Sequence, residues 1–168
     1  MENTSFHKKA VFFDRDGVLN EKREDYVKSV DELTIISGIE KGLFLLQQNG
    51  FELFIITNQS VINRGIISLD IEEKINQKLL NYLKKYGIKI TKIYLCPHRP
   101  DENCSCRKPK PGLILKAALE NSIDLKQSWF IGDSDSDKKA ALSAKCKFLL
   151  NKTDGDLNPL VNLILSNS

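Results

Sequence analysis

Short apolar runs alternate along this chain with longer segments of helical periodicity, and this alternation constrains the fold more than any other feature. The apolar runs lie at residues 10–13, 51–56, 93–95, 129–131 and 148–150. Segments with helical features lie at residues 37–50, 69–86, 111–119, 138–144 and from 158 onward. Strands and helices in alternation predict an α/β fold, with a Rossmann-like parallel sheet that carries helices on both faces.

Two of the expected helices begin at residues that can satisfy free backbone N–H groups. Ser37 and Glu40 have the spacing of a capping box. Asn158, followed by Pro159, is the expected cap of the last helix. The helix before it is expected over residues 138–144.

Length and composition suit a single soluble domain over residues 1–168, with 41% hydrophobic and 28% charged residues. The formal charge of +3 arises from 25 basic and 22 acidic residues, so charge alone does not favour a nucleic-acid partner. The N-terminal segment lacks a signal-peptide pattern, and no apolar run approaches the roughly 18 residues of a membrane span. We therefore expect a cytoplasmic protein without a membrane partner, and a monomer is plausible.

Three of the apolar runs end in polar residues that can carry chemistry. Asp14 and Asp16 follow the first run, Thr57 follows the second, and Asp133 follows the fourth. Parallel strands place their carboxyl ends at one edge of the sheet, where ligands bind in such folds. Asp14 and Asp16 are two residues apart, so both can face one cavity while Arg15 points away.

These residue types together favour the hydrolysis of a phosphate monoester. Two carboxylates that face one cavity repel, and Mg²⁺ held by Asp14, Asp133 and the backbone carbonyl of Asp16 would relieve that repulsion. Asp14 is then the expected nucleophile, which forms an aspartyl-phosphate. Asp16 is the expected acid and base, and Thr57 and Lys108 are expected to stabilise the phosphoryl oxygens.

A second metal site is predicted from Cys96, His98, Cys104 and Cys106, which lie within eleven residues. Three thiolates and one imidazole suit closed, tetrahedral Zn²⁺. With all four positions filled by protein, the zinc is expected to be structural and to fix the loop that leads into Arg107. The alternative is a disulfide or a set of reduced thiols.

Four segments, in order, carry a resemblance to a known family: DRDGVLN at 14–20, TNQS at 57–60, RKPKPG at 107–112 and GDSDSD at 132–137. Over about residues 8–150 the chain resembles phosphatases of the haloacid dehalogenase superfamily. More narrowly, it resembles the D-glycero-D-manno-heptose 1,7-bisphosphate 7-phosphatases, which have the same zinc loop. The resemblance implies the roles assigned above and a sugar-phosphate substrate used in the synthesis of nucleotide-heptose, lipopolysaccharide or surface-glycan precursors.

The resemblance also implies a set of substrate contacts. These are Asn58, Gln59, Ser60, Arg64 and Arg107, with the pair Asp25 and Tyr26, where Asp25 replaces a glycine common in the family. Ser134 stands where some members have a lysine. The spacing between the motifs leaves no room for a large inserted cap domain, so an open site is expected.

Two other functions compete with this interpretation. A histidinol-phosphate phosphatase would share the aspartate pair and the zinc loop, although Ser60 and Arg64 favour the heptose family. A nucleic-acid end-processing phosphatase or binding module belongs to another class, and the sequence shows no basic stripe with stacking aromatic residues to favour it.

Overall fold

A five-stranded parallel sheet of order β3-β2-β1-β4-β5 forms the centre of the protein. The computed structural model describes residues 7–168, so residues 1–6 of the segment tested for a signal peptide lie outside the described residues. The strands are β1 (Lys9–Phe13), β2 (Phe51–Asn58), β3 (Lys92–Cys96), β4 (Trp129–Gly132) and β5 (Lys147–Leu150). The predicted parallel sheet is confirmed.

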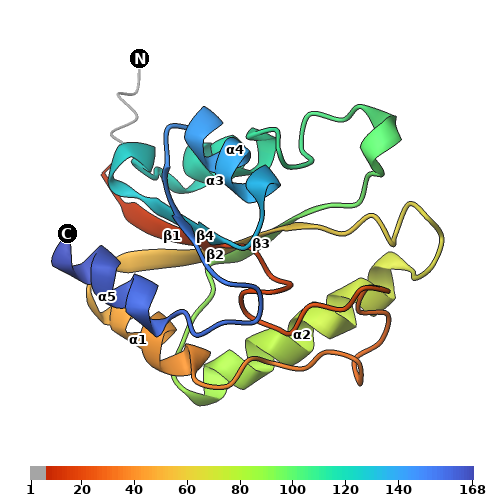
Figure 1. Ribbon diagram of the computed structural model, residues 1–168, viewed down its shortest axis with the longest axis horizontal. Helices are drawn as coiled ribbons and strands as arrows, with labels where there is room; N and C mark the ends of the chain where they lie inside the picture. Colours follow the sequence, from red (N-terminus) through yellow and green to blue (C-terminus); the bar gives the residue numbers. More distant parts are fainter. Residues whose placement is uncertain (1–6) are drawn as a thin grey trace.

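Helices cover both faces of this sheet, as Figure 1 shows. The helices are α1 (Ile39–Gln48), α2 (Leu69–Lys85), α3 (Gly112–Asn121), α4 (Asp135–Ser143) and α5 (Asn158–Ser166), and short 3-10 turns lie at Pro100–Glu102 and Leu125–Gln127. In Figure 1, α1, α2 and α5 lie below the sheet, whereas α3 and α4 lie above it. The predicted layering is confirmed, and no large cap covers the sheet within residues 7–168.

The central strand β1 explains why its sequence is apolar without alternation. Val11 and Phe13 are buried in the hydrophobic cluster that α1, α2 and α5 share with the sheet. Ala10 and Phe12 are buried in the cluster on the opposite face, under α3 and α4. A strand covered on both faces needs apolar side chains at every position.

Two of the predicted helix caps are wrong. The N-cap of α1 is Gly38, with φ of 87° and no side-chain cap, so Ser37 and Glu40 do not form the expected capping box. Asn158 lies inside α5, whose N-cap is Leu157. The Asn158 amide instead donates to the carbonyl oxygen of Gly38 at 3.1 Å, which joins the start of α5 to the start of α1.

Helix α4 begins earlier than its apolar pattern indicated. It starts at Asp135 rather than at Lys138, because Ser134 and Asp137 form a capping box at its N-terminus. Ser134 accepts from the Asp137 backbone N–H at 3.3 Å, and Asp137 accepts from the Ser134 backbone N–H at 3.2 Å. This reciprocal cap fixes the loop that follows β4.

Among residues 7–168, none of the helices combines the length and the apolar character that crossing a bilayer requires.

Candidate active site

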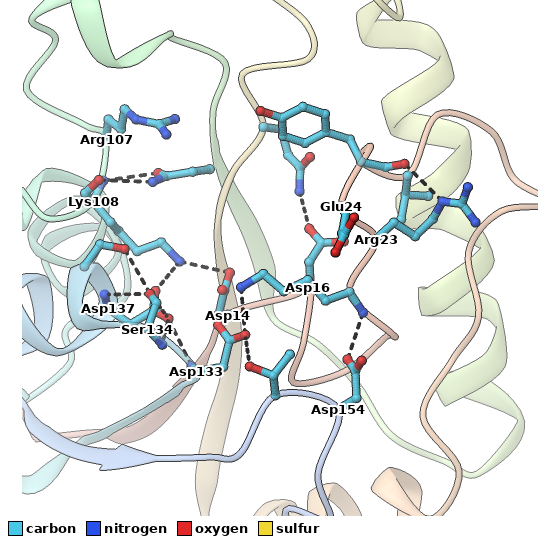
Figure 2. A pocket seen from close by; sticks show the side chains of 17 residues that line it. Asp14, Asp16, Arg23, Glu24, Arg107, Lys108, Asp133, Ser134, Asp137 and Asp154 are labelled. Atoms are coloured by element: carbon cyan, nitrogen blue, oxygen red, sulfur yellow. Dashed lines mark hydrogen bonds and ion pairs between the residues drawn. The ribbon is translucent and has the colours of Figure 1, made fainter.

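A cavity of about 550 Å³ opens at the carboxyl edge of the sheet, beyond β1, β2 and β4. Figure 2 shows the side chains that line it. Eight of the predicted site residues are among them: Asp14, Asp16, Tyr26, Asn58, Gln59, Arg107, Lys108 and Asp133. Residues from loops far apart in the sequence therefore meet at the carboxyl edge of the sheet, where the predicted parallel strands would place them.

Asp14 and Lys108 form a buried ion pair at the floor of this cavity. Lys108 Nζ lies 2.9 Å from Asp14 Oδ1 and 2.7 Å from Asp137 Oδ1. Burial opposes a charged lysine, but Asp14 and Asp137 outweigh it and raise the pKa of Lys108. The ammonium group is thus held charged between two carboxylates (Figure 2).

The loop that carries Lys108 is tied to the end of β2. The Asn58 side chain accepts from the Lys108 backbone N–H and donates to its carbonyl oxygen, each at 3.1 Å. The Lys108 ammonium also donates to the carbonyl oxygen of Ile56 at 2.8 Å. Asn58 therefore positions Lys108 as well as lining the cavity.

Asp14 lies where its ionised form is disfavoured in the absence of a metal ion, even beside the Lys108 ammonium. Burial raises its pKa to about 7; Lys108 opposes this rise, while the charges of Asp137 and Asp16 add to it. A group with this pKa changes charge near neutral pH, so a nearby cation would decide its protonation state.

One carboxylate oxygen of Asp133 has no hydrogen-bond partner among residues 7–168. The Oδ2 atom accepts from Lys22 Nζ and from Thr153 Oγ1, both at 2.9 Å, whereas the buried Oδ1 atom accepts from none of the described residues. Ligand atoms of Asp14, Asp133 and Asp137 lie within 4.8 Å of one another. Clustered carboxylate oxygens with one buried acceptor free fit a hard divalent cation such as Mg²⁺.

Gly17 allows the loops after β1 and β4 to approach this closely. Its φ is 86°, and a Cβ at this position would lie 2.3 Å from Asp133 Oδ2. The Gly17 carbonyl oxygen also accepts from the Asp154 backbone N–H at 2.9 Å. Any side chain here would displace Asp133 or the loop that carries the aspartate pair.

Asp16 is held as a carboxylate by three donors, two from its own loop and one from the loop after β2. Gln59 Nε2 donates to it at 2.6 Å, Asn20 Nδ2 at 2.9 Å, and one Arg15 nitrogen at 3.2 Å. Burial alone would raise the pKa of Asp16, but the Arg15 charge and these hydrogen bonds lower it. Asp16 therefore rests in its ionised form.

Four predicted site residues do not line the cavity: Thr57, Ser60, Arg64 and Asp25. Thr57 is fully buried, and its hydroxyl accepts from Gln59 Nε2 at 2.9 Å. Ser60 is also buried and accepts from Arg64 Nε at 3.2 Å. Asp25 is exposed and pairs with neighbouring basic side chains. The structure therefore does not bring these four side chains to the cavity surface.

Several lining residues were missed from the sequence, including Lys22, Arg23, Glu24, Thr153 and Asp154. The first three form a charged run directly after the aspartate motif, and the last two lie in a polar loop after β5. The signal that could have found them is position, because both segments lie at the same edge of the sheet as Asp14.

The predicted zinc ligands come together beside the cavity. Sγ of Cys106 lies 3.1 Å from Sγ of Cys96, 3.6 Å from Sγ of Cys104 and 3.3 Å from Nδ1 of His98. All three cysteines are free thiols. Sulfur ligands of tetrahedral zinc, with bonds of about 2.3 Å, lie about 3.7 Å apart, so the cluster fits a metal ion of this kind.

A Rossmann-like sheet without a large cap, with an aspartate pair, a buried lysine and a third aspartate at its carboxyl edge, defines a phosphatase of the haloacid dehalogenase superfamily. The family model described as polynucleotide kinase 3 phosphatase matches residues 9–157. The chain belongs to this family and, within it, to the group of D-glycero-D-manno-heptose-1,7-bisphosphate 7-phosphatases.

Curated relatives and a solved structure support the narrower assignment. The chain is 46% identical over 140 residues to the D-glycero-beta-D-manno-heptose-1,7-bisphosphate 7-phosphatase of Helicobacter pylori, covering 83% of this chain and 80% of that protein. It is 38% identical over 143 residues to the Pseudomonas aeruginosa enzyme of the same name, covering 85% and 80%. The D,D-heptose 1,7-bisphosphate phosphatase of B. bronchiseptica, solved with magnesium and phosphate, superposes with a TM-score of 0.88 at 30% identity, covering 95% of this chain and 99% of that one.

Proposed function

We propose that this protein hydrolyses the 7-phosphate of D-glycero-D-manno-heptose 1,7-bisphosphate, in the synthesis of nucleotide-heptose, lipopolysaccharide or surface-glycan precursors. The observation that carries the proposal is the position of Asp14, 2.9 Å from the Lys108 ammonium and clustered within 4.8 Å with Asp133, whose buried Oδ1 has no partner among the described residues. The names of the relatives support the substrate. The whole chain, residues 1–168, would act as one domain.

In the first step, an Asp14 carboxylate oxygen attacks phosphorus, and the bond between phosphorus and the sugar oxygen breaks. The product is an aspartyl-phosphate and a free sugar hydroxyl. Lys108 is close enough to Asp14 to compensate the charge on the phosphoryl oxygens during transfer. The Thr57 hydroxyl is fully buried and accepts from Gln59, which leaves its O–H free to donate to a phosphoryl oxygen beside Lys108.

Asp16 moves the protons in both steps. It rests as a carboxylate, so it must take up a proton before it can protonate the leaving sugar oxygen. The substrate phosphate, whose second pKa is near 6, can deliver that proton as a monoanion. After transfer, Asp16 is a carboxylate again and can take a proton from the water that hydrolyses the aspartyl-phosphate.

Asp14, Asp133 and the backbone carbonyl of Asp16 would hold Mg²⁺, and the partnerless Asp133 oxygen supports this donor set. When bound, the ion supplies positive charge to the phosphoryl oxygens and favours the ionised form of Asp14. Asp137 contributes differently, because its carboxylate pairs with Lys108 and caps the loop that carries Asp133.

The cluster of Cys96, His98, Cys104 and Cys106 would hold a structural Zn²⁺, since all four positions of a tetrahedron are filled by protein. The Arg107 backbone N–H donates to Cys104 Sγ at 3.3 Å. A bound ion would therefore fix where Arg107 and the following lysine point.

The substrate contacts proposed here are the predicted residues that line the cavity, namely Tyr26, Asn58, Gln59 and Arg107. Lys22 and Arg23 add positive charge to the lining of the same cavity. A phosphorylated sugar with a second anionic group fits this combination of cations and polar side chains. We propose a cytoplasmic, monomeric enzyme that acts on this small molecule and not on nucleic acid.

The test is phosphate release in the presence of magnesium from three substrates: the heptose bisphosphate, histidinol phosphate and a single-stranded oligonucleotide with a 3′-phosphate. Wild type and Asp14→Asn are compared on each. We expect strong, Asp14-dependent preference for the bisphosphate. Preference for histidinol phosphate or for the oligonucleotide would overturn the substrate, and activity that survives Asp14→Asn would overturn the mechanism.

A further inference from the structure

Arg15 lies between the two aspartates of the motif but points away from the cavity and into the protein interior. Its side chain is fully buried, as is that of Glu72 on α2. One guanidinium nitrogen of Arg15 lies 2.5 Å from Glu72 Oε1 and 2.8 Å from Asn76 Oδ1, one helical turn further along α2. Two side chains of α2 therefore hold the guanidinium in one orientation.

The other terminal nitrogen of Arg15 donates to the two carboxylate oxygens of Asp16, at 3.2 Å and 3.3 Å. The planar guanidinium thus joins α2 to the proposed acid and base of the active site. Neither Glu72 nor Asn76 lines the active-site cavity, and Arg15 joins both of them to Asp16 by hydrogen bonds.

A buried ion pair is a poor means of stabilising a fold. Removing two charges from water costs several kcal/mol, and apolar replacements of similar volume are often neutral or stabilising. Arginine does offer a rigid fork of donors that fixes geometry better than lysine can. Because Arg15 of this ion pair also binds Asp16, its rigid fork can hold the Asp16 carboxylate in place.

We propose that Arg15, held by Glu72 and Asn76, is a positioning residue that aims the Asp16 carboxylate at the leaving oxygen of the substrate. This inference rests on the proposed phosphatase function. Asp16 lies in a loop that turns at a glycine of positive φ, where the backbone alone constrains a side chain weakly. A proton donor must lie within about 2.6–3.2 Å of the oxygen that it protonates, so small displacements of Asp16 matter.

Displacement of Asp16 should affect substrates according to their leaving groups. A sugar alkoxide needs a proton as it leaves, whereas p-nitrophenolate leaves without one. Loss of the Arg15 fork should therefore slow phosphoryl transfer from the sugar phosphate and spare transfer from p-nitrophenyl phosphate. Hydrolysis of the aspartyl-phosphate also needs Asp16 as a base, so p-nitrophenolate should then appear as a burst.

The test uses the double variant Arg15→Leu/Glu72→Leu, which removes the ion pair with α2 without leaving the Glu72 carboxylate buried and unpaired. Arg15→Lys keeps the charge and loses the fork, and Glu73→Gln is the matched control on the exposed side of α2. Single-turnover and burst kinetics are measured on the heptose bisphosphate and on p-nitrophenyl phosphate, with KM and the unfolding midpoint for each variant. Asp14→Asn is included as the chemical blank.

We expect the double variant and Arg15→Lys to cleave the sugar phosphate at least about tenfold more slowly, since positioned proton transfer contributes roughly 10²–10⁴ in rate. Their KM and their p-nitrophenolate burst rate should stay within about threefold of wild type, and Glu73→Gln should match wild type. Unchanged sugar-phosphate cleavage in a folded double variant would overturn the proposal. The proposal would also be overturned if phosphoryl transfer slowed equally for the two substrates, or if Arg15→Lys cleaved the sugar phosphate at the wild-type rate. Activity that survives Asp14→Asn would instead overturn the proposed function.

Discussion

Replacing the proposed nucleophile should stabilise the protein when magnesium is absent. Burial and the neighbouring carboxylates raise the pKa of Asp14 from its ordinary value of 3.8 to about 7. The folded protein therefore disfavours the carboxylate that the unfolded chain tolerates. Asp14→Asn removes this charge and keeps an oxygen that can accept from Lys108.

The pH at which this cost appears follows from the two pKa values of Asp14. Below pH 3.8 the side chain is protonated in both states and contributes nothing. As the pH rises from 3.8 to about 7, the unfolded chain loses the proton while the folded protein keeps it, so stability falls. Above about pH 7 the loss of folding stability no longer changes with pH. The difference of about three units between the folded and unfolded pKa values of Asp14 corresponds to about 4 kcal/mol.

The assay is urea unfolding of wild type and Asp14→Asn in magnesium-free buffer with the zinc retained, from pH 5 to pH 8. We expect the variant to be more stable at pH 8, by up to about 4 kcal/mol, with a gap that narrows toward pH 5. Saturating magnesium should narrow the gap at pH 8, because wild type gains more binding energy. The control is Asp31→Asn, which replaces an exposed carboxylate that does not line the cavity. A variant no more stable than wild type at pH 8 without magnesium would refute the reasoning.

Three further predictions concern the loops around the cavity. Gly17→Ala should lower the free energy of unfolding in urea by roughly 1–2 kcal/mol, because alanine disfavours the positive φ of this position. It should also slow phosphate release about tenfold, because the added Cβ displaces Asp133. Wild-type values in both assays would contradict this prediction. Cys106→Ser should abolish stoichiometric zinc in metal analysis and speed amide exchange in the following loop; retained zinc would show that the cysteine is no ligand. Arg107→Ala should raise KM about tenfold, because the substrate loses one charge-assisted hydrogen bond. Arg64→Ala should change KM less than about twofold, because Arg64 does not line the cavity. A larger rise in KM for Arg64→Ala than for Arg107→Ala would contradict this prediction.

The fold could be predicted because the central strands are short, continuous apolar runs that can be recognised from neighbouring residues alone. Strand β1 is apolar at Ala10, Val11, Phe12 and Phe13, and only a strand buried on both faces explains such a run. The parallel order then placed the ends of β1 and β4, with Asp14 and Asp133, at one edge. Chemistry at that edge followed from residue types alone.

What could not be predicted depends on side-chain direction and on pairs far apart in the chain. Arg15 and Glu72 are separated by 57 positions, and no local pattern links them. Thr57 ends a strand as expected, but its hydroxyl is covered by Gln59 rather than exposed to the cavity. In the sequence, Lys22 cannot be distinguished from an ordinary surface lysine. In the structure, the loop after β1 places its ammonium group beside Asp133.

The central place of β1 in the sheet has a consequence for how the chain acquires its fold during synthesis. One neighbour of β1 is β2, which begins at Phe51, but the other is β4, where Val11 pairs with Trp129. A growing chain therefore carries an apolar strand with one open edge until most of its length has been made. Such long-range pairing slows folding and exposes the strand to aggregation, so chaperone dependence should be greatest for nascent chains that end before β4. The arrangement that gathers the catalytic groups at one edge thus makes the nucleophile's own strand wait longest, among the three interior strands, for its second neighbour.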